Sequence, residues 1–187
     1  LKFMQRWNQR LAPKLLVVTV EEAPTFDSWA DSLWEEARGS YSLTAVRDAN
    51  ALRQLYPAAD THFTRLRVLA GGAVIGWAVV AERRKSARFG NLRVGSVVDG
   101  FAAPKNALPV VRAAVQALER RGVDAVFSNQ SHEAWQRAFR DSGFLRGPSN
   151  FIFAASRKLS EMLAPWDETI KRMHFTRADG DGLPRNF

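Results

Sequence analysis

The sequence predicts an α/β (α+β) fold, with a mixed β-sheet and helices on both of its faces. Three observations predict this class. Residues 15–55 contain an apolar strand pattern followed by two amphipathic helix patterns. Residues 62–101 change to a strand period around the dipeptide Gly71-Gly72, which is typical of an antiparallel meander. Residues 106–155 then alternate between helix and strand, and such a strand–helix–strand step favours a parallel pair.

The first half of the chain is predicted to hold one strand, two helices and the meander. Leu15–Val20 is β-branched and apolar, as strands are. A helix over Phe26–Ala37 follows, with Thr25 or Asp27 as its N-cap, and Asp48–Leu55 forms a second, short helix. The strands of the meander are expected at His62–Leu69, Ala73–Ala81 and Leu92–Phe101.

The second half is predicted to alternate between helix and strand. Asn106 is expected to cap a helix over Ala107–Arg121, which buries Leu118 in its apolar stripe and ends at Gly122. Ser131 is expected to cap the next helix. Strands are expected at Asp124–Ser128, Phe151–Ala155 and His174–Thr176, with weak helical character over Ser160–Lys171.

The composition describes one globular domain. The chain has 187 residues, of which 46% are hydrophobic and 25% are charged, so it can bury a full core. Because cysteine is absent, disulfides, cysteine-ligated zinc and a thiol nucleophile are excluded. The three histidines are scattered along the chain, so we expect no metal site. The sequence has no signal peptide and no apolar run of about 18 residues, so we expect a cytoplasmic protein without a membrane span.

Basic residues exceed acidic ones, 27 against 19, which gives a formal net charge of +8. A surface of this charge favours anionic partners such as nucleic acid, phosphorylated cofactors or acidic lipid headgroups. The alternative is an arginine-rich protein whose basic residues lie on ordinary amphipathic segments. Residues 1–14 are basic and start at Leu1, and we expect them to form a linker or terminal segment after a preceding region.

Three stretches of the second half carry a family resemblance. In the GNAT (Gcn5-related) N-acyltransferase superfamily, the fourth strand and its exit resemble VVDGFAAP at residues 97–104. The central helix and the fifth strand resemble NALPVVRAAVQALERRGVDAVFSN at residues 106–129. The closing helix and the strand after it resemble HEAWQRAFRDSGFLRGPSNFIFA at residues 132–154.

The resemblance covers residues 15–176 and implies one GNAT-like domain, followed by a polar tail over residues 177–187. Near its end, HFTRADGDG at residues 174–182 is similar to the last strand of bacterial proteins in which two such domains stand in tandem. The chain therefore resembles the second half of a tandem protein.

The resemblance implies that an acyl group passes from a thioester, acyl-CoA (acetyl-CoA), to an amine. Members of the superfamily hold the pyrophosphate on the N–H groups of a glycine-rich turn before the central helix. Here that turn is Phe101–Asn106, which has no glycine after Gly100, and Pro104 lacks an N–H donor. Lys105 supplies a charge but not the missing donors. We therefore predict that this chain alone binds acetyl-CoA weakly or not at all.

The resemblance also implies the site residues. Asp99 at a strand exit, or Glu82 at the end of the preceding strand, takes the proton of the amine. The alternatives are a turn residue for Asp99 and a solvated salt link for Glu82. Backbone donors near Val98–Phe101 hold the cofactor arm and the thioester carbonyl. The residues expected at the cofactor are Val98, Gly100, Phe101, Lys105, Asn106 and Asn129. For Asn129 the alternative is a loop residue that bonds to its own backbone.

Other candidate residues have plainer interpretations. Arg83, Arg84, Lys85, Arg88 and Arg93 form a basic group around a hairpin connection. This group either grips phosphates or keeps a strand edge solvated. No Ser/His/Asp motif involves His174, and Asp179 with Asp181 offers too few oxygen ligands for a calcium loop, so we expect both aspartates in a flexible tail.

The function expected first is a GNAT-fold acyltransferase-like domain with an altered pyrophosphate loop and an amine substrate that the sequence does not identify. Two other functions stay open. One is a non-catalytic GNAT-like half that supports a preceding catalytic domain in the same chain. The other is a basic module that binds RNA or aminoacyl-tRNA, for which the net charge of +8 is the support.

Overall fold

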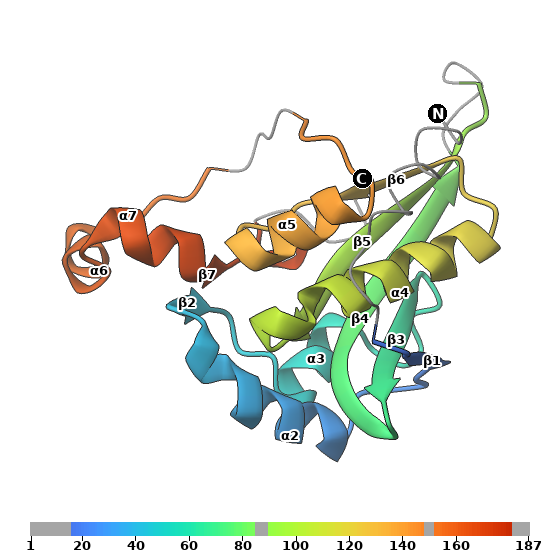
Figure 1. Ribbon diagram of the computed structural model, residues 1–187, viewed down its shortest axis with the longest axis horizontal. Helices are drawn as coiled ribbons and strands as arrows, with labels where there is room; N and C mark the ends of the chain where they lie inside the picture. The colour runs from blue at the N-terminus through green and yellow to red at the C-terminus, as the bar shows by residue number, and fades with distance from the viewer. Residues whose placement is uncertain (1–15, 85–89, 148–151, 181–187) are drawn as a thin grey trace.

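A five-stranded mixed sheet forms the centre of the computed structural model, which describes residues 16–84, 90–147 and 152–180 (Figure 1). In spatial order its strands are β1 (Thr19–Glu22), β3 (Phe63–Ala70), β4 (Ala73–Arg84), β5 (Arg93–Ala102) and β6 (Ala125–Ser128). The pairs from β1 to β5 are antiparallel, and β5 pairs with β6 in parallel. The predicted fold class, with an antiparallel meander and a parallel step, is therefore confirmed.

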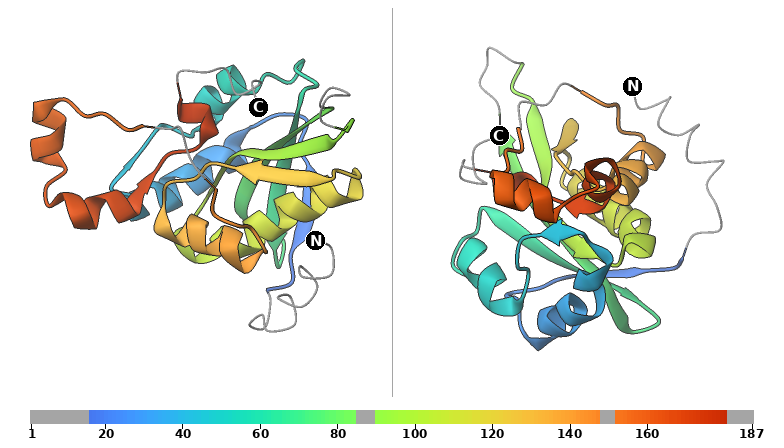
Figure 2. Two further views of the ribbon diagram at one scale, coloured as in Figure 1. Left: turned by 90° about the horizontal axis from the view of Figure 1, so that it is seen from above. Right: turned by 90° about the vertical axis from the view of Figure 1, so that its left-hand side faces the viewer.

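Helices cover both faces of the sheet, as predicted. On one face lie α2 (Ser28–Ala37) and α3 (Ala49–Leu55), and on the other lie α4 (Ala107–Arg120) and α5 (Glu133–Asp141) (Figure 2). Because β4 has helices on both sides, its residues Trp77–Ala81 are all buried. The turn between β3 and β4 uses Gly71 and Gly72 at φ angles of 57° and 84°, which other residues rarely adopt.

The C-terminal part of the chain extends beyond the end of the sheet and then returns to it (Figure 1). It holds the short helices α6 (Arg157–Met162) and α7 (Trp166–Thr169) and the 3-10 turn η5 (Ile170–Arg172). The returning strand β7 (Met173–His174) pairs in parallel with β2 (Leu43–Thr44), which follows the 3-10 turn η2 (Arg38–Ser40). The 3-10 turn η6 (Arg177–Asp179) comes after β7.

Side-chain caps fix where the helices begin. The carboxylates of Asp27 and Asp48 accept from backbone N–H groups at the starts of α2 and α3. Asp27 was one of the two predicted caps of α2, whereas Asp48 was predicted as the first residue of its helix and is its N-cap. The prediction for Ser131 was wrong, because His132 caps α5 by accepting from the N–H of Ala134. The side chain of Asn106 makes no cap either, and α4 instead continues from the 3-10 turn η4 (Pro104–Asn106).

The strand predicted over Phe151–Ala155 is not formed by residues 152–155, and Phe151 lies outside the described residues. The aromatic ring of Phe153 stacks on Trp166 and on Phe175, with centroid distances of 5.9 and 5.1 Å. This stacking takes the segment toward α7 and away from β6. The prediction failed because a short apolar run is compatible both with backbone pairing in a sheet and with packing of its aromatic side chains alone.

The helix α4 lies unusually close to the sheet at two glycines. A Cβ atom on Gly76 would collide with Cγ2 of Val110, and one on Gly95 would lie 3.0 Å from Cδ1 of Leu118. Leu118 is fully buried, which confirms its predicted place in the core. The absence of a side chain at these two positions therefore sets the depth at which α4 packs.

Candidate functional site

The sheet opens where β5 and β6 separate. The two strands pair only as far as Val97 and Ser128, whereas β5 continues to Ala102. A bulge lies at the same point, because Val80 faces Val97 and Val79 faces Asp99, which leaves Val98 as an extra residue. Beyond the bulge, β5 has an edge whose backbone groups are not paired by β6. A sheet edge of this kind is a ready binding place for an extended ligand with amide groups.

In this structure the chain's own side chains occupy that edge. The carbonyl oxygen of Gly100 accepts from Nε2 of His174 at 2.8 Å, and the carbonyl oxygen of Ala102 accepts from Oη of Tyr41 at 2.5 Å. The N–H of Gly100 donates to Oδ1 of Asp99 at 2.9 Å. Residues two apart in a strand direct their carbonyls to the same side, so both bonds are on one edge of β5. We refer to Gly100 and Ala102 with these three contacts as the capped edge.

Aromatic rings fill the space beside the capped edge. The imidazole of His174 lies between Tyr41 and Trp135, with centroid distances of 4.9 and 5.1 Å and interplanar angles of 29° and 28°. Nε1 of Trp135 donates to Oη of Tyr41 at 3.0 Å. All three side chains are buried, and His174 and Trp135 have no exposed surface. The opening between β5 and β6 is thus closed by packed side chains.

Burial also fixes the protonation states of this cluster. Loss of solvation lowers the pKa of His174 to about 3, so its imidazole is neutral near pH 7. Since Nε2 must carry the proton that it donates to Gly100, Nδ1 is the unprotonated nitrogen, and it has no hydrogen-bond partner among the described residues. Burial raises the pKa of Tyr41 to about 12, so its phenol keeps the proton that it donates to Ala102.

A buried ion network lies next to the capped edge. Nε of Arg47 is 3.0 Å from Oδ2 of Asp99, and Nη2 of Arg47 donates to both carboxylate oxygens of Asp179 at 2.7 Å. Oη of Tyr56 donates to Oδ2 of Asp99 at 3.0 Å. Burial acts to lower the pKa of Arg47, but Asp99 and Asp179 together raise it above its usual value. Burial raises the pKa of Asp99, and Arg47 opposes this shift.

The segment after β7 is folded so that it presents Asp179 to Arg47. Thr176 and Asp179 form a capping box, in which the N–H of Thr176 donates to Asp179 and the N–H of Ala178 donates to Oγ1 of Thr176. Asp179 therefore belongs to the folded domain, which corrects its assignment to a flexible tail. Asp181 lies outside the described residues.

The two predicted proton acceptors have different surroundings. Asp99 is fully buried and ion-paired with Arg47. Glu82 lies on the surface, where its carboxylate is 2.8 Å from Nη2 of Arg93 and 4.0 Å from Nη1 of Arg121. The arginine that pairs with Asp99 differs from the two that lie near Glu82, so the two carboxylates share no ion-pair partner. The alternative of a solvated salt link for Glu82 agrees with its geometry.

The predicted cofactor residues are only partly brought together. Val98 and Phe101 are buried, and Gly100 belongs to the capped edge. Lys105 is exposed, and Asn129 is half-buried after the end of β6. Asn106 donates through Nδ2 to the carbonyl of Ile75 at 3.4 Å.

The turn before α4 uses its own N–H groups. The N–H of Asn106 donates to the carbonyl of Ala103 at 2.8 Å, and the N–H of Ala107 bonds to the carbonyl of Pro104. Pro104 has no N–H group. A pyrophosphate would need several converging donors at this place. Both N–H groups are therefore engaged within the turn itself.

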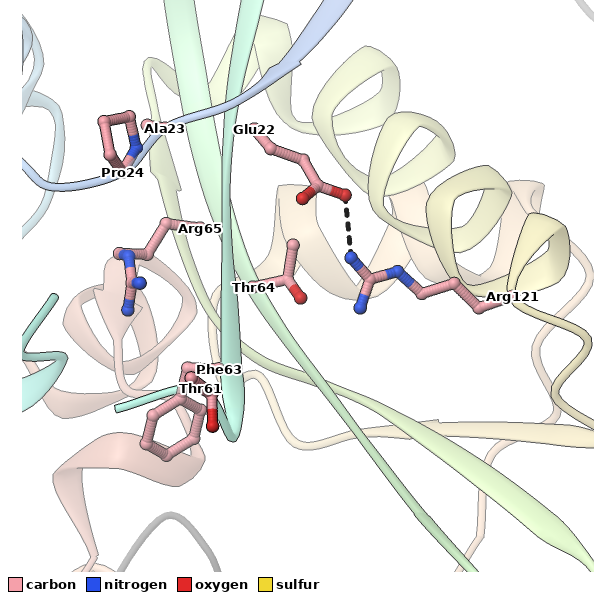
Figure 3. A pocket seen from close by; sticks show the side chains of 8 residues that line it. All are labelled: Glu22, Ala23, Pro24, Thr61, Phe63, Thr64, Arg65 and Arg121. Carbon is pink, nitrogen blue, oxygen red and sulfur yellow. Dashed lines mark hydrogen bonds and ion pairs between the residues drawn. The ribbon is translucent and has the colours of Figure 1, made fainter. Parts of the chain in front are cut away.

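A shallow cavity of about 480 Å³ lies elsewhere, at the opposite side of the sheet next to β1 and β3 (Figure 3). Glu22 and Arg121 line one part of it and form an ion pair of 2.7 Å. Thr64 and Arg65 also line it but point to opposite sides of β3 (Figure 3). None of the predicted site residues lines this cavity.

The described residues form neither a metal-binding cluster nor a membrane-spanning helix. Within the described ranges, no cluster of three or more His, Asp or Glu side chains is arranged for a metal ion. None of the helices in that part of the chain has the length and apolarity that a bilayer crossing requires.

Sequence reasoning missed the residues that close the site. Tyr41 and Arg47 belong to no motif, and each contacts a residue more than 60 positions away, at 61 and 132 positions. His174 and Asp179 lie in the HFTRADGDG stretch, where the sequence predicts a strand at His174–Thr176 and a flexible tail at Asp179 but no contact with the site. The signal available was the capping-box spacing of Thr176 and Asp179.

Comparison with known proteins gives a likeness in structure only. No family model and no curated protein matches the chain. A ribosomal-protein-alanine N-acetyltransferase from Brucella melitensis biovar Abortus 2308 has a TM-score of 0.53 at 11% identity, over 74% of this chain and 100% of that chain. Glucosamine-6-phosphate N-acetyltransferase from Arabidopsis thaliana has a TM-score of 0.50 at 11% identity, over 75% and 99%.

An aminoglycoside acetyltransferase, HMB0005, from an uncultured soil metagenomic sample also has a TM-score of 0.50, at 17% identity, over 75% of this chain and 99% of that chain. At such identities the likeness shows the fold alone. The chain has a GNAT-like fold.

Proposed function

We propose that this chain is a GNAT-fold, N-acyltransferase-like domain that does not bind acyl-CoA by itself and supports a catalytic partner domain. The observation that carries the proposal is the capped edge, where His174 and Tyr41 bond to the carbonyls of Gly100 and Ala102. The fold supports the acyltransferase character, because similar solved structures include two N-acetyltransferases and an aminoglycoside acetyltransferase.

Acyl-CoA does not fit the residues that this chain offers. The amide-bearing arm of the cofactor needs free backbone groups on a strand edge, and here those of Gly100 and Ala102 are taken. Its pyrophosphate needs N–H donors, and those of Asn106 and Ala107 bond within their own turn. Lys105 is the exposed cation of that turn and attracts a phosphate without orienting it.

Asp99 is also poorly placed to accept a proton from an amine. A general base must reach the proton within hydrogen-bond distance, directly or through one water. Asp99 has no exposed surface, and its oxygens already face Arg47, Tyr56 and the N–H of Gly100. This arrangement is typical of a structural ion pair and supports a domain without its own transfer chemistry.

A partner domain completes the proposal. We infer that a preceding GNAT domain in the same chain, as the HFTRADGDG resemblance suggests, carries the transfer to an amine. The folded domain, which reaches at least to Asp179, is then the supporting domain, and residues 1–14 form the connection to it. Acetyl transfer by the whole gene product, and none by residues 1–187 alone, is the expected result.

Calorimetric titration of the chain with acetyl-CoA tests the central statement. We expect no saturable heat at acetyl-CoA concentrations up to about 1 mM, which corresponds to a binding free energy weaker than about −4 kcal/mol. A micromolar dissociation constant that Lys105→Ala or Asn129→Ala abolishes would overturn the proposal. Lys158→Ala on α6 is the matched control, because it removes one positive charge away from the capped edge.

A further inference from the structure

We propose that Met173–Asp179 is an internal latch, which occupies the free edge of β5 in place of a ligand and leaves it without unfolding the sheet. This inference rests on the proposed function, since it explains what keeps the edge unavailable. It concerns the stretch HFTRAD, which the sequence predicts to begin as a strand and to which the expected site assigns no role.

Two separate grips hold the latch at the β5 end. At one point, Nε2 of His174 donates to the carbonyl of Gly100 at 2.8 Å. At the other, the carboxylate of Asp179 accepts from Nη2 of Arg47 at 2.7 Å. Nε of the same Arg47 is 3.0 Å from Oδ2 of Asp99. The latch therefore contacts the strand edge directly and reaches Asp99 through Arg47.

The backbone of the latch pairs with the rest of the molecule at only a few residues and is not a strand of the five-stranded sheet. β7 pairs with β2 through two residue pairs, Leu43 with Met173 and Thr44 with His174. A single antiparallel bridge joins Gln130 to Thr176. Near this bridge, Oγ of Ser131 donates to the carbonyl of Met173 at 2.8 Å and accepts from the N–H of Phe175 at 2.7 Å.

The sheet does not depend on the latch in the same way. β4 pairs with β3 and β5 along most of its length, through eight and nine residue pairs. Segments with few ladder bonds open at a lower free energy than the central strands. The latch can therefore open while β3, β4 and β5 stay folded. Opening frees the carbonyl of Gly100, whereas the carbonyl of Ala102 stays bonded to Tyr41.

Hydrogen exchange of the chain and of two variants tests this device. Asp179→Ala removes the grip on Arg47, and His174→Ala removes the grip on Gly100. In both variants we expect amide exchange in residues 173–179 and at Gly100 to rise at least tenfold, with no change at Trp77–Ala81 of β4. Asp167→Ala, at an exposed position of α7, is the matched control and should change neither region.

The opposite pattern overturns the latch. If exchange at residues 173–179 and at Trp77–Ala81 rises by the same factor, the segment is an integral part of the core and opens only with the whole domain. Should one variant fail to fold, the other still removes a different grip and decides between the two patterns.

Pantetheine, the amide-bearing arm without the nucleotide, is the probe for the opened edge. We expect millimolar pantetheine to shift the backbone amide resonance of Gly100 in Asp179→Ala and not in the unmodified chain. An unshifted resonance in the opened variant would overturn the latch as an occupant of a binding edge. Binding of acetyl-CoA by the unmodified chain is a different result, which overturns the proposed function whatever the exchange pattern.

Discussion

Cγ2 of Val110 on α4 lies directly over the α-carbon of Gly76 on β4, where a Cβ atom has no room. Gly76→Ala is therefore expected to destabilise the domain by about 1–3 kcal/mol, the usual cost of overpacking a core. Urea unfolding followed by circular dichroism measures the loss. Gly39→Ala is the control, because a Cβ atom there meets nothing within 4 Å. Equal stabilities of the two variants would show that α4 moves away without cost.

Leu118 tests the same interface from the side of the helix. It is fully buried against Gly95, so Leu118→Ala should lower the free energy of unfolding by about 2–5 kcal/mol through lost transfer energy and a new cavity. Leu145→Ala, at a residue that is 87% exposed, should change it by less than about 0.5 kcal/mol. A melting temperature of Leu118→Ala equal to that of the control would contradict the packing described.

Arg47 neutralises two carboxylates, so its removal should be costly. Arg47→Met leaves Asp99 buried without a counter-charge, and we expect a loss of about 3–5 kcal/mol in the free energy of unfolding. The matched control is Arg137→Met, which breaks an exposed pair with Glu133 and should cost less than about 1 kcal/mol. A loss at Arg47 no larger than that at Arg137 would show that water reaches Asp99.

The buried histidine gives the stability a pH dependence of known sign. In the unfolded chain a histidine takes up a proton below its ordinary pKa of 6.5, whereas His174 in the folded chain stays neutral until about pH 3. Protons therefore bind preferentially to the unfolded chain in this window, and the free energy of unfolding falls as the pH falls from about 6.5 to about 3.

The slope from His174 is about 1.4 kcal/mol per pH unit once the unfolded histidine is protonated. His174→Gln keeps a hydrogen-bond donor at the end of the side chain and does not titrate. Between pH 6 and 5, the free energy of unfolding of this variant should therefore fall by about 1.4 kcal/mol less than that of the unmodified chain. Urea titrations at both pH values measure the difference. An unchanged slope would mean that His174 is protonated in the folded domain.

How far the sequence predicts this molecule depends on the range of the interactions involved. The meander around Gly71-Gly72 and the parallel step across Leu118 follow from local periodicity, because turn chemistry and helix amphipathicity act over a few residues. The N-cap at Asp27 follows for the same reason. These elements together define the fold class.

The site was less predictable because its contacts join distant parts of the chain. The place of Asp99 at a strand exit predicts a proton acceptor, and no residue near it in the sequence indicates that Arg47 neutralises its charge. Serine is a preferred N-cap residue, but the hydroxyl of Ser131 bonds to Met173 and Phe175. His132 is the N-cap of α5 instead. Only the capping-box spacing of Thr176 and Asp179 indicated locally that the end of the domain is ordered.

The pairing of Arg47 with Asp179 also constrains the order in which the domain folds. The two residues are 132 positions apart, so closing this contact has a large loop entropy cost unless other elements have already shortened the loop. During synthesis, α3 and β5 leave the ribosome well before Asp179 does, and until then Arg47 and Asp99 lack their third partner. We therefore expect the contact of the C-terminal segment with Arg47 to form late in folding, so that a nascent domain holds the pair of Arg47 and Asp99 without its third partner until Asp179 is synthesised.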